Sequence, residues 1–121
     1  VDMADLLKCC SVNQATGHPI AVFAGFETTL LPALACGAVG GVGGTFSYAA
    51  GPARRLLAAW EAKDLATARM EQARIIALFG VLFAPQYRDR FAAVSKAILK
   101  LKGMDVGPTR PPIATLTDEE T

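Results

Sequence analysis

The residues best placed for chemistry follow two short apolar runs of the sequence. Glu27 comes soon after the first run, residues 20–24, and Gly43 and Gly44 follow the second run, residues 38–42. In α/β enzymes the functional groups stand at the carboxyl ends of the strands. Two glycines at such an end present bare backbone amides that suit an anionic group. These residues therefore form the candidate site.

Simpler interpretations exist for the same residues. Glu27 equally suits a solvated loop acid or a charge in the first turn of a helix. The glycine run matches neither GxxxxGK[ST] nor a GxGxxG that opens a helix, which disfavours a nucleotide site. Small residues that allow close backbone approach are the better explanation. The nearby polar residues Thr28, Thr45, Ser47 and Tyr48 form no recognisable catalytic triad.

The chain shows no evident nucleophile, metal site or disulfide framework. Cys9, Cys10 and Cys36 are odd in number and lack a CxxC spacing, which favours a reducing compartment. The single histidine, His18, precedes a proline in a turn and is expected on a surface loop. The lysines fall on polar helix faces or beside helix ends, where an amine stays protonated.

Composition indicates one globular domain. The 121 residues are 52% hydrophobic and 19% charged. A net charge of +1 leaves no basic surplus for a phosphate backbone, and no apolar run reaches the length of a membrane span. The acidic opening lacks the basic start of a signal peptide. We therefore expect a cytoplasmic protein without nucleic-acid or membrane partners.

The two apolar runs predict a strand–helix–strand unit. Residues 20–24 show no polar alternation, which is typical of a strand covered on both faces of a parallel sheet. Thr28 or Thr29 would cap a short buried helix that Gly37 ends. The small residues 38–42 predict the second strand. Such a crossover is right-handed, and its ligand end is the carboxyl end of the strands.

Helices are predicted on both sides of this unit. We expect them over residues 2–15, 51–63, 65–83 and 88–101. Asp64 would cap the third helix and Gly103 would end the fourth. Residues 104–115 predict a proline-rich loop, and Thr117 with Glu120 spells a capping box for a helix that does not follow. This unfinished helix and a two-stranded sheet with two open edges predict a truncated chain.

Two stretches resemble the carboxyl-terminal part of the dihydrodipicolinate synthase and N-acetylneuraminate lyase superfamily. The first is GFETTLLPALACGAVGGVGGTFSY, residues 25–48, with a Gly-x-acid turn, LLPAL and a strand of small residues. The second is GMDVGPTRPPIATLT, residues 103–117, which contains G-x-x-x-GP-x-R-x-P. An apolar helix entered through KDLATA lies between them. The resemblance covers essentially the whole chain.

The resemblance implies a (β/α)8 TIM barrel with extra terminal helices. This α/β chain would hold only its seventh and eighth strands and would be an incomplete barrel. Residues 1–63 would be the carboxyl-terminal part of the barrel, and residues 64–121 the helical extension, truncated at a helix start. The family likeness also implies a homotetramer that includes the remainder of the barrel.

The implied activity is that of a class I aldolase or lyase. A lysine on the sixth strand would form a Schiff base with pyruvate or another 2-keto acid, a tyrosine on the fourth would relay protons, and no cofactor would be needed. Both residues would lie outside this chain, so the chain alone has no catalytic residue and should be inactive. The alternative is a noncatalytic fragment or degenerate paralogue with a structural role in assembly.

The substrate-binding residues implied by the resemblance surround the two strand ends. Gly25 matches a backbone contact of the sialic acid lyases, and Glu27 stands where they carry an Asp that binds sugar hydroxyls. Thr28 replaces an acid and Gly44 replaces a serine, which disfavours sialic acid itself but leaves the pyruvate chemistry untouched. The expected set is completed by Gly43 and Thr45. The acceptor aldehyde stays open.

Overall fold

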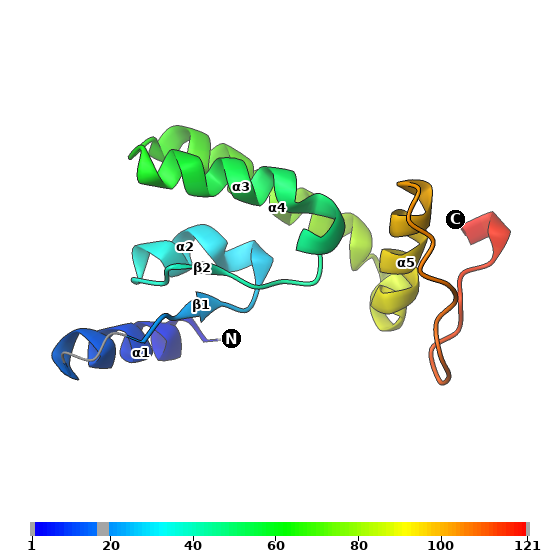
Figure 1. Cartoon of the computed structure of the whole chain (residues 1–121), viewed down its shortest axis with the longest axis horizontal. Coiled ribbons are helices and arrows are strands. Elements are labelled where there is room, and N and C mark those ends of the chain that lie inside the picture. The colour runs from blue at the N-terminus through cyan, green and yellow to red at the C-terminus, as the bar shows by residue number, and fades with distance from the viewer. Residues whose placement is uncertain (1, 17–19, 121) are drawn as a thin grey trace. The chain divides into compact units, whose positions relative to one another are not determined.

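A computed structural model of the chain describes residues 2–16 and 20–120, so the expected loop position of His18 lies outside the described residues. The chain forms two compact units, Val1–Ile76 and Ala77–Thr121. The helices and strands are α1 (Met3–Thr16), β1 (Phe23–Ala24), α2 (Leu30–Ala35), β2 (Gly40–Gly41), α3 (Phe46–Glu61), α4 (Leu65–Leu82) and α5 (Phe91–Leu101) (Figure 1). Three 3-10 turns, η1 (Glu27–Thr29), η2 (Pro85–Arg90) and η3 (Asp118–Glu120), complete them. A domain boundary after Lys63 stays a prediction.

The two strands pair in parallel, as the crossover pattern predicts. Phe23 lies opposite Gly40 and Ala24 lies opposite Gly41. Between them the chain passes through α2, which contacts α1, both strands and α3 (Figure 1). The carboxyl ends of β1 and β2 therefore lie side by side, where the sequence places the candidate site.

Both strands are shorter than the apolar runs that predict them. The prediction of a strand covered on both faces is wrong for the described chain, because Ile20 is 72% exposed and Phe23 is 51% exposed. Regular pairing is limited to two residues in each strand, although the Val42 amide still donates to the Ala24 carbonyl at 2.8 Å. The Val39 amide likewise donates to the Val22 carbonyl at 2.9 Å, so hydrogen bonds between the two segments continue just beyond the paired residues.

The expected threonine cap of α2 is also wrong. The Thr29 hydroxyl donates to the Phe26 carbonyl at 3.1 Å, and Thr29, the residue at the N-cap position, makes no side-chain cap hydrogen bond. The 3-10 turn η1 leads directly into α2, and the Leu30 amide donates to the Glu27 carbonyl within it. Because the Leu30 amide is already hydrogen-bonded within the 3-10 turn, a threonine hydroxyl has one amide fewer to cap. Leu30, Ala33 and Leu34 are buried.

The helix α3 begins at Phe46 but bends at Ala49, so the predicted start at Gly51 falls in the first turn after the bend. Pro52 lies inside α3 and, as predicted, close to the start of the helical segment that follows the bend. Proline lacks an amide hydrogen and its ring crowds the carbonyl four residues earlier. The backbone accordingly leaves the helical region at Ala49, with φ −134° and ψ 36°.

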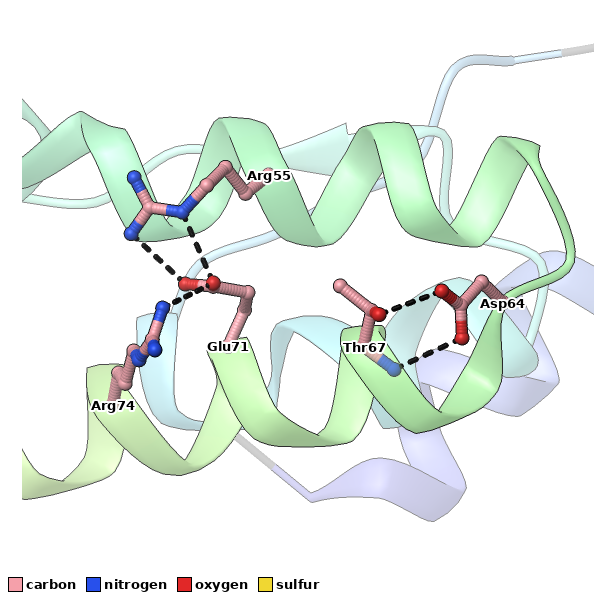
Figure 2. Close-up of polar contacts among 5 residues, drawn as sticks. All are labelled: Arg55, Asp64, Thr67, Glu71 and Arg74. Carbon is pink, nitrogen blue, oxygen red and sulfur yellow. Dashed lines mark hydrogen bonds and ion pairs between the residues drawn. The ribbon is translucent and has the colours of Figure 1, made fainter.

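Charged side chains connect α3 with α4, and another caps the start of α4 (Figure 2). The Arg55 guanidinium binds both oxygens of Glu71 at 3.0 Å, and Arg74 binds Glu71 from the next turn. The Glu71 side chain is 2% exposed, and the Arg55 hydrogen bond lowers the pKa of its carboxyl. Asp64 accepts from the Thr67 amide at 3.0 Å, which confirms the predicted cap of α4.

Stacked aromatic rings mark the start of the second unit. Phe79 stacks on Phe83 with centroids 4.7 Å apart, and Phe83 stacks on Phe91 at 5.1 Å. The helix α5 begins at Phe91 rather than at Arg88, because the 3-10 turn η2, which starts at Pro85, extends to Arg90. Gly103 has φ +87° and ends α5, as predicted.

The carboxyl-terminal segment is held by one arginine. Arg90 binds Glu120 in a bidentate pair, with N–O distances of 2.6 and 3.0 Å, and also donates to the Thr115 carbonyl at 3.0 Å. Glu120 accepts from the Thr117 amide at 2.8 Å, so the side-chain half of the predicted capping box forms. Because hydrogen bonds to the ionised carboxyl favour that form, the pKa of Glu120 falls from 4.5 to about 2.

Lys96 departs from the expectation of a lysine that faces only water. Its ammonium group donates to three consecutive backbone carbonyls, those of Val106, Gly107 and Pro108, at 2.9 to 3.4 Å. The contact holds the turn after α5.

No helix of the described residues is long and apolar enough to cross a membrane.

Two glycines allow the close approach of elements in the first unit. A Cβ atom on Gly41 would lie 2.9 Å from Leu30 Cδ1, and one on Gly43 would lie 2.2 Å from Glu27 Cδ. The second distance is far inside van der Waals contact. The predicted role of these glycines in close backbone approach is confirmed, and Gly43 makes the space that the Glu27 carboxylate fills.

We expect Gly43→Ala to destabilise the intact protein by roughly 1–3 kcal/mol, because the new methyl group must displace the Glu27 carboxylate. Urea denaturation measures the difference. Gly25→Ala is the matched control, because a Cβ atom at Gly25 meets nothing within 4 Å. An equal loss of stability in the two variants would contradict the steric argument.

We expect Arg90→Met to flatten the acid dependence of the carboxyl-terminal segment. A carboxyl whose folded pKa is lowered stabilises the fold fully above its unfolded value of 4.5, and this contribution fades as pH falls toward about 2. Amide hydrogen exchange of residues 115–120, taken as the ratio of variant to wild type at each pH, measures it. The ratio should approach one on acidification, whereas a constant ratio would count against the pair. Arg110→Met, which replaces an exposed cation of the same segment, is the control.

Candidate functional site

Glu27 is buried between the carboxyl ends of the two strands. Its Oε1 atom accepts hydrogen bonds from the Thr45 backbone amide at 2.8 Å and from the Thr45 hydroxyl at 2.9 Å. Glu27 is 5% exposed and Thr45 is 2% exposed. The interpretation of Glu27 as a solvated loop acid is therefore wrong, although the residue does open a helical turn, η1.

The two oxygens of the Glu27 carboxylate have different surroundings. Both Thr45 contacts fall on Oε1, and no hydrogen bond from the described residues reaches Oε2. One oxygen holds the strand ends together, and the other can accept a hydrogen bond from a ligand.

Gln72 of α4 holds the backbone on the other side of Glu27. Its Nε2 atom donates to the Glu27 carbonyl at 3.1 Å, and its Oε1 atom accepts from the Leu31 amide at 2.8 Å. Gln72 is 7% exposed. The sequence places it in the apolar stripe of a predicted helix. A polar side chain inside a buried stripe needs hydrogen-bond partners, and that requirement was the signal that could have identified it.

Of the remaining predicted residues, only Gly43 is shown to pack against the carboxylate among the described residues. Gly25 and Gly44 are exposed and Thr28 is half-buried. The Gly44 carbonyl accepts from the Ser47 hydroxyl at 2.8 Å. The structure thus joins Glu27, Gly43 and Thr45 directly. Substrate contacts at all six positions stay predictions.

The described residues around Glu27 form neither a metal site nor the wall of the largest cavity reported below. Among the described residues, no group of three or more histidine, cysteine or acidic side chains could hold a metal ion. A cavity of about 630 Å³ lies in the second unit, between α5 and the segment that follows it, where Lys96, Lys100 and Thr109 are part of its lining. Neither Glu27 nor Thr45 lines that cavity. The chemistry at the strand ends is hydrogen-bond acceptance by a fixed carboxylate.

Comparison with known proteins places this geometry in a family. The model described as the dihydrodipicolinate synthetase family matches residues 2–121. N-acetylneuraminate lyase of Rattus norvegicus is 34% identical over 121 residues, which are 99% of this chain and 36% of that protein. The 4-hydroxy-tetrahydrodipicolinate synthase of Mycobacterium leprae is 36% identical over 117 residues, 97% of this chain and 37% of that protein.

The likeness extends to three dimensions. The crystal structure of N-acetylneuraminate lyase from Fusobacterium nucleatum complexed with pyruvate matches with a TM-score of 0.78 at 28% identity, over 98% of this chain and 38% of that one. The chain spans somewhat more than a third of the length of the curated relatives it matches. The family match runs from residue 2 to residue 121 and confirms the resemblance read from the sequence. The chain belongs to the dihydrodipicolinate synthetase family.

Proposed function

We propose that this chain is part of a Schiff-base aldolase or lyase, which forms or cleaves a carbon–carbon bond between pyruvate, or another 2-keto acid, and an aldehyde. The observation that carries the proposal is the family match over residues 2–121 together with a likeness to a lyase that binds pyruvate. In the proposal, the catalytic lysine and the proton-relaying tyrosine belong to strands outside this chain. The chain supplies the wall of the site that faces the aldehyde.

The proposed reaction requires an amine and a proton relay. The lysine amine condenses with the keto carbon and water leaves, which gives an imine. Loss of a proton from the adjacent carbon gives an enamine, which attacks the aldehyde carbon, and the aldehyde oxygen takes up a proton. Water then releases the lysine and the product. Bond cleavage is the reverse sequence.

Within this scheme Glu27 binds the aldehyde substrate rather than the keto acid. Both Thr45 hydrogen bonds fall on Oε1, and none from the described residues reaches Oε2. This arrangement supports the role, because a carboxylate oxygen without a protein partner can accept a hydrogen bond from a hydroxyl group. The backbone of Gly25 would add a contact, and Gly44 and Thr28 would shape the space beside it. The lyase and the synthase compared above have nearly equal identity to this chain, 34% and 36%, so the comparison favours neither acceptor.

The compartment and assembly belong to the same proposal. Cys9, Cys10 and Cys36 are free thiols, which supports a cytoplasmic location. A homo-oligomer, formed with the remainder of the barrel, is proposed from the family likeness.

Borohydride trapping tests the reaction. The intact protein incubated with pyruvate and borohydride should gain the mass of one reduced pyruvate adduct on a single lysine, because reduction makes the imine permanent. Peptide mass spectrometry locates that lysine. A protein that gains no mass would lack the proposed activity and would favour a noncatalytic role in assembly. A control with borohydride but without pyruvate excludes nonspecific labelling.

Glu27→Gln tests the acceptor role of the carboxylate. Glutamine keeps an oxygen for Thr45 but can place an NH2 group, a donor, where Oε2 accepts. We expect the KM for glyceraldehyde to rise at least about tenfold, equivalent to ~1.4 kcal/mol, while pyruvate trapping stays unchanged. Propanal, which has the same carbon skeleton without hydroxyls, is the matched control, and its KM should not change. An equal rise for both aldehydes would contradict hydroxyl recognition.

A further inference from the structure

The backbone that carries Glu27 is interrupted between η1 and α2. Thr29 lies at φ −117° and ψ 18°, outside the helical region, and separates the 3-10 turn from the helix. In a continuous α-helix the Leu31 amide would donate to the Glu27 carbonyl four residues earlier. Here that carbonyl accepts instead from the Leu30 amide, in the tighter 3-10 pattern. The break leaves the Leu31 amide without its helical partner.

The side-chain amide of Gln72 occupies the place of the missing bond. Its oxygen accepts from the Leu31 amide at 2.8 Å, and its nitrogen donates to the Glu27 carbonyl at 3.1 Å. A glutamine amide carries a donor and an acceptor on one planar group, which suits both contacts at once. A side chain inserted into a helical ladder is a recognised cause of such a break. Gln72 therefore completes the hydrogen bonding of an irregular turn.

We propose that Gln72 is a positioning residue for the aldehyde-binding side of the site, acting through the backbone of Glu27. The proposal rests on the proposed function. Gln72 holds the backbone carbonyl of Glu27, and Thr45 holds the Oε1 atom of its side chain. Together the two contacts fix the position of Oε2. Small displacements of a substrate-binding group carry large kinetic costs, so a second support is functionally significant. The residue comes from α4, more than forty positions away in the sequence.

A neighbouring residue separates positioning from simple stability. Glu71 is next to Gln72 on α4 and is also buried, but its carboxylate binds Arg55 and Arg74 and does not touch the turn. Loss of either side chain removes buried hydrogen bonds. Only the loss of Gln72 frees the backbone of Glu27. Gln72→Met and Glu71→Met therefore each remove a buried polar side chain from α4. Only Gln72→Met removes hydrogen bonds to the turn.

The test uses the intact protein. Gln72→Met should raise the KM for glyceraldehyde about tenfold or more, since the hydroxyl acceptor is no longer held in place, and should speed hydrogen exchange at the Leu31 amide by about tenfold. The extent of pyruvate trapping should stay within about twofold of wild type, because the keto-acid pocket does not contain Gln72. Glu71→Met should leave the glyceraldehyde KM and the Leu31 exchange rate near wild-type values.

Gln72→Glu provides a second variant if the methionine variant fails to fold. It keeps an acceptor for the Leu31 amide but loses the donor to the Glu27 carbonyl, so Leu31 protection should persist while the glyceraldehyde KM rises. Normal trapping with an unchanged KM in a folded Gln72 variant would overturn the positioning role. Unchanged Leu31 exchange in Gln72→Met would overturn it independently of any activity. A wild-type protein that traps no pyruvate would instead overturn the proposed function.

Discussion

The first unit depends on one close approach, where a carboxylate fills the space that a glycine leaves empty. The Cδ atom of Glu27 would stand 2.2 Å from a Cβ atom at Gly43, and Oε1 receives both hydrogen bonds that Thr45 can give it. A charged group buried at this depth is stable only when it is hydrogen-bonded. The contact therefore satisfies the acid and at the same time joins the ends of β1 and β2.

The helix α4 supports this contact by two adjacent residues with separate duties. Glu71 binds arginines and pairs α4 with α3, whereas Gln72 binds backbone and holds the turn ahead of α2. Both are polar residues in a stripe that otherwise packs apolar side chains such as Ala68 and Ile75. A helix outside the two strands and their crossover thus contributes to the order of the site.

Patterns that act over a few residues were predictable from the sequence. The parallel strand–helix–strand unit, the Asp64 cap and the Gly103 stop each follow from local chemistry. The burial of Glu27 was not predictable, because its partner Thr45 lies eighteen residues away. The short helical segment from Phe46 to the bend in α3 was not predicted, because Gly51 and Pro52 mark only the segment after the bend at Ala49. A long-range partner decided the burial of Glu27, whereas local backbone chemistry decided the bend in α3.

The packing of Gly43 against Glu27 has a consequence for substitution at either position. The two positions share one volume in this chain, so a side chain at position 43 fits without displacement only where the side chain at position 27 is shorter. An aspartate, one methylene shorter, would free part of that volume. Exchange of the turn after β1 alone would therefore disturb the end of β2, whereas exchange of the two segments together would keep their packing matched.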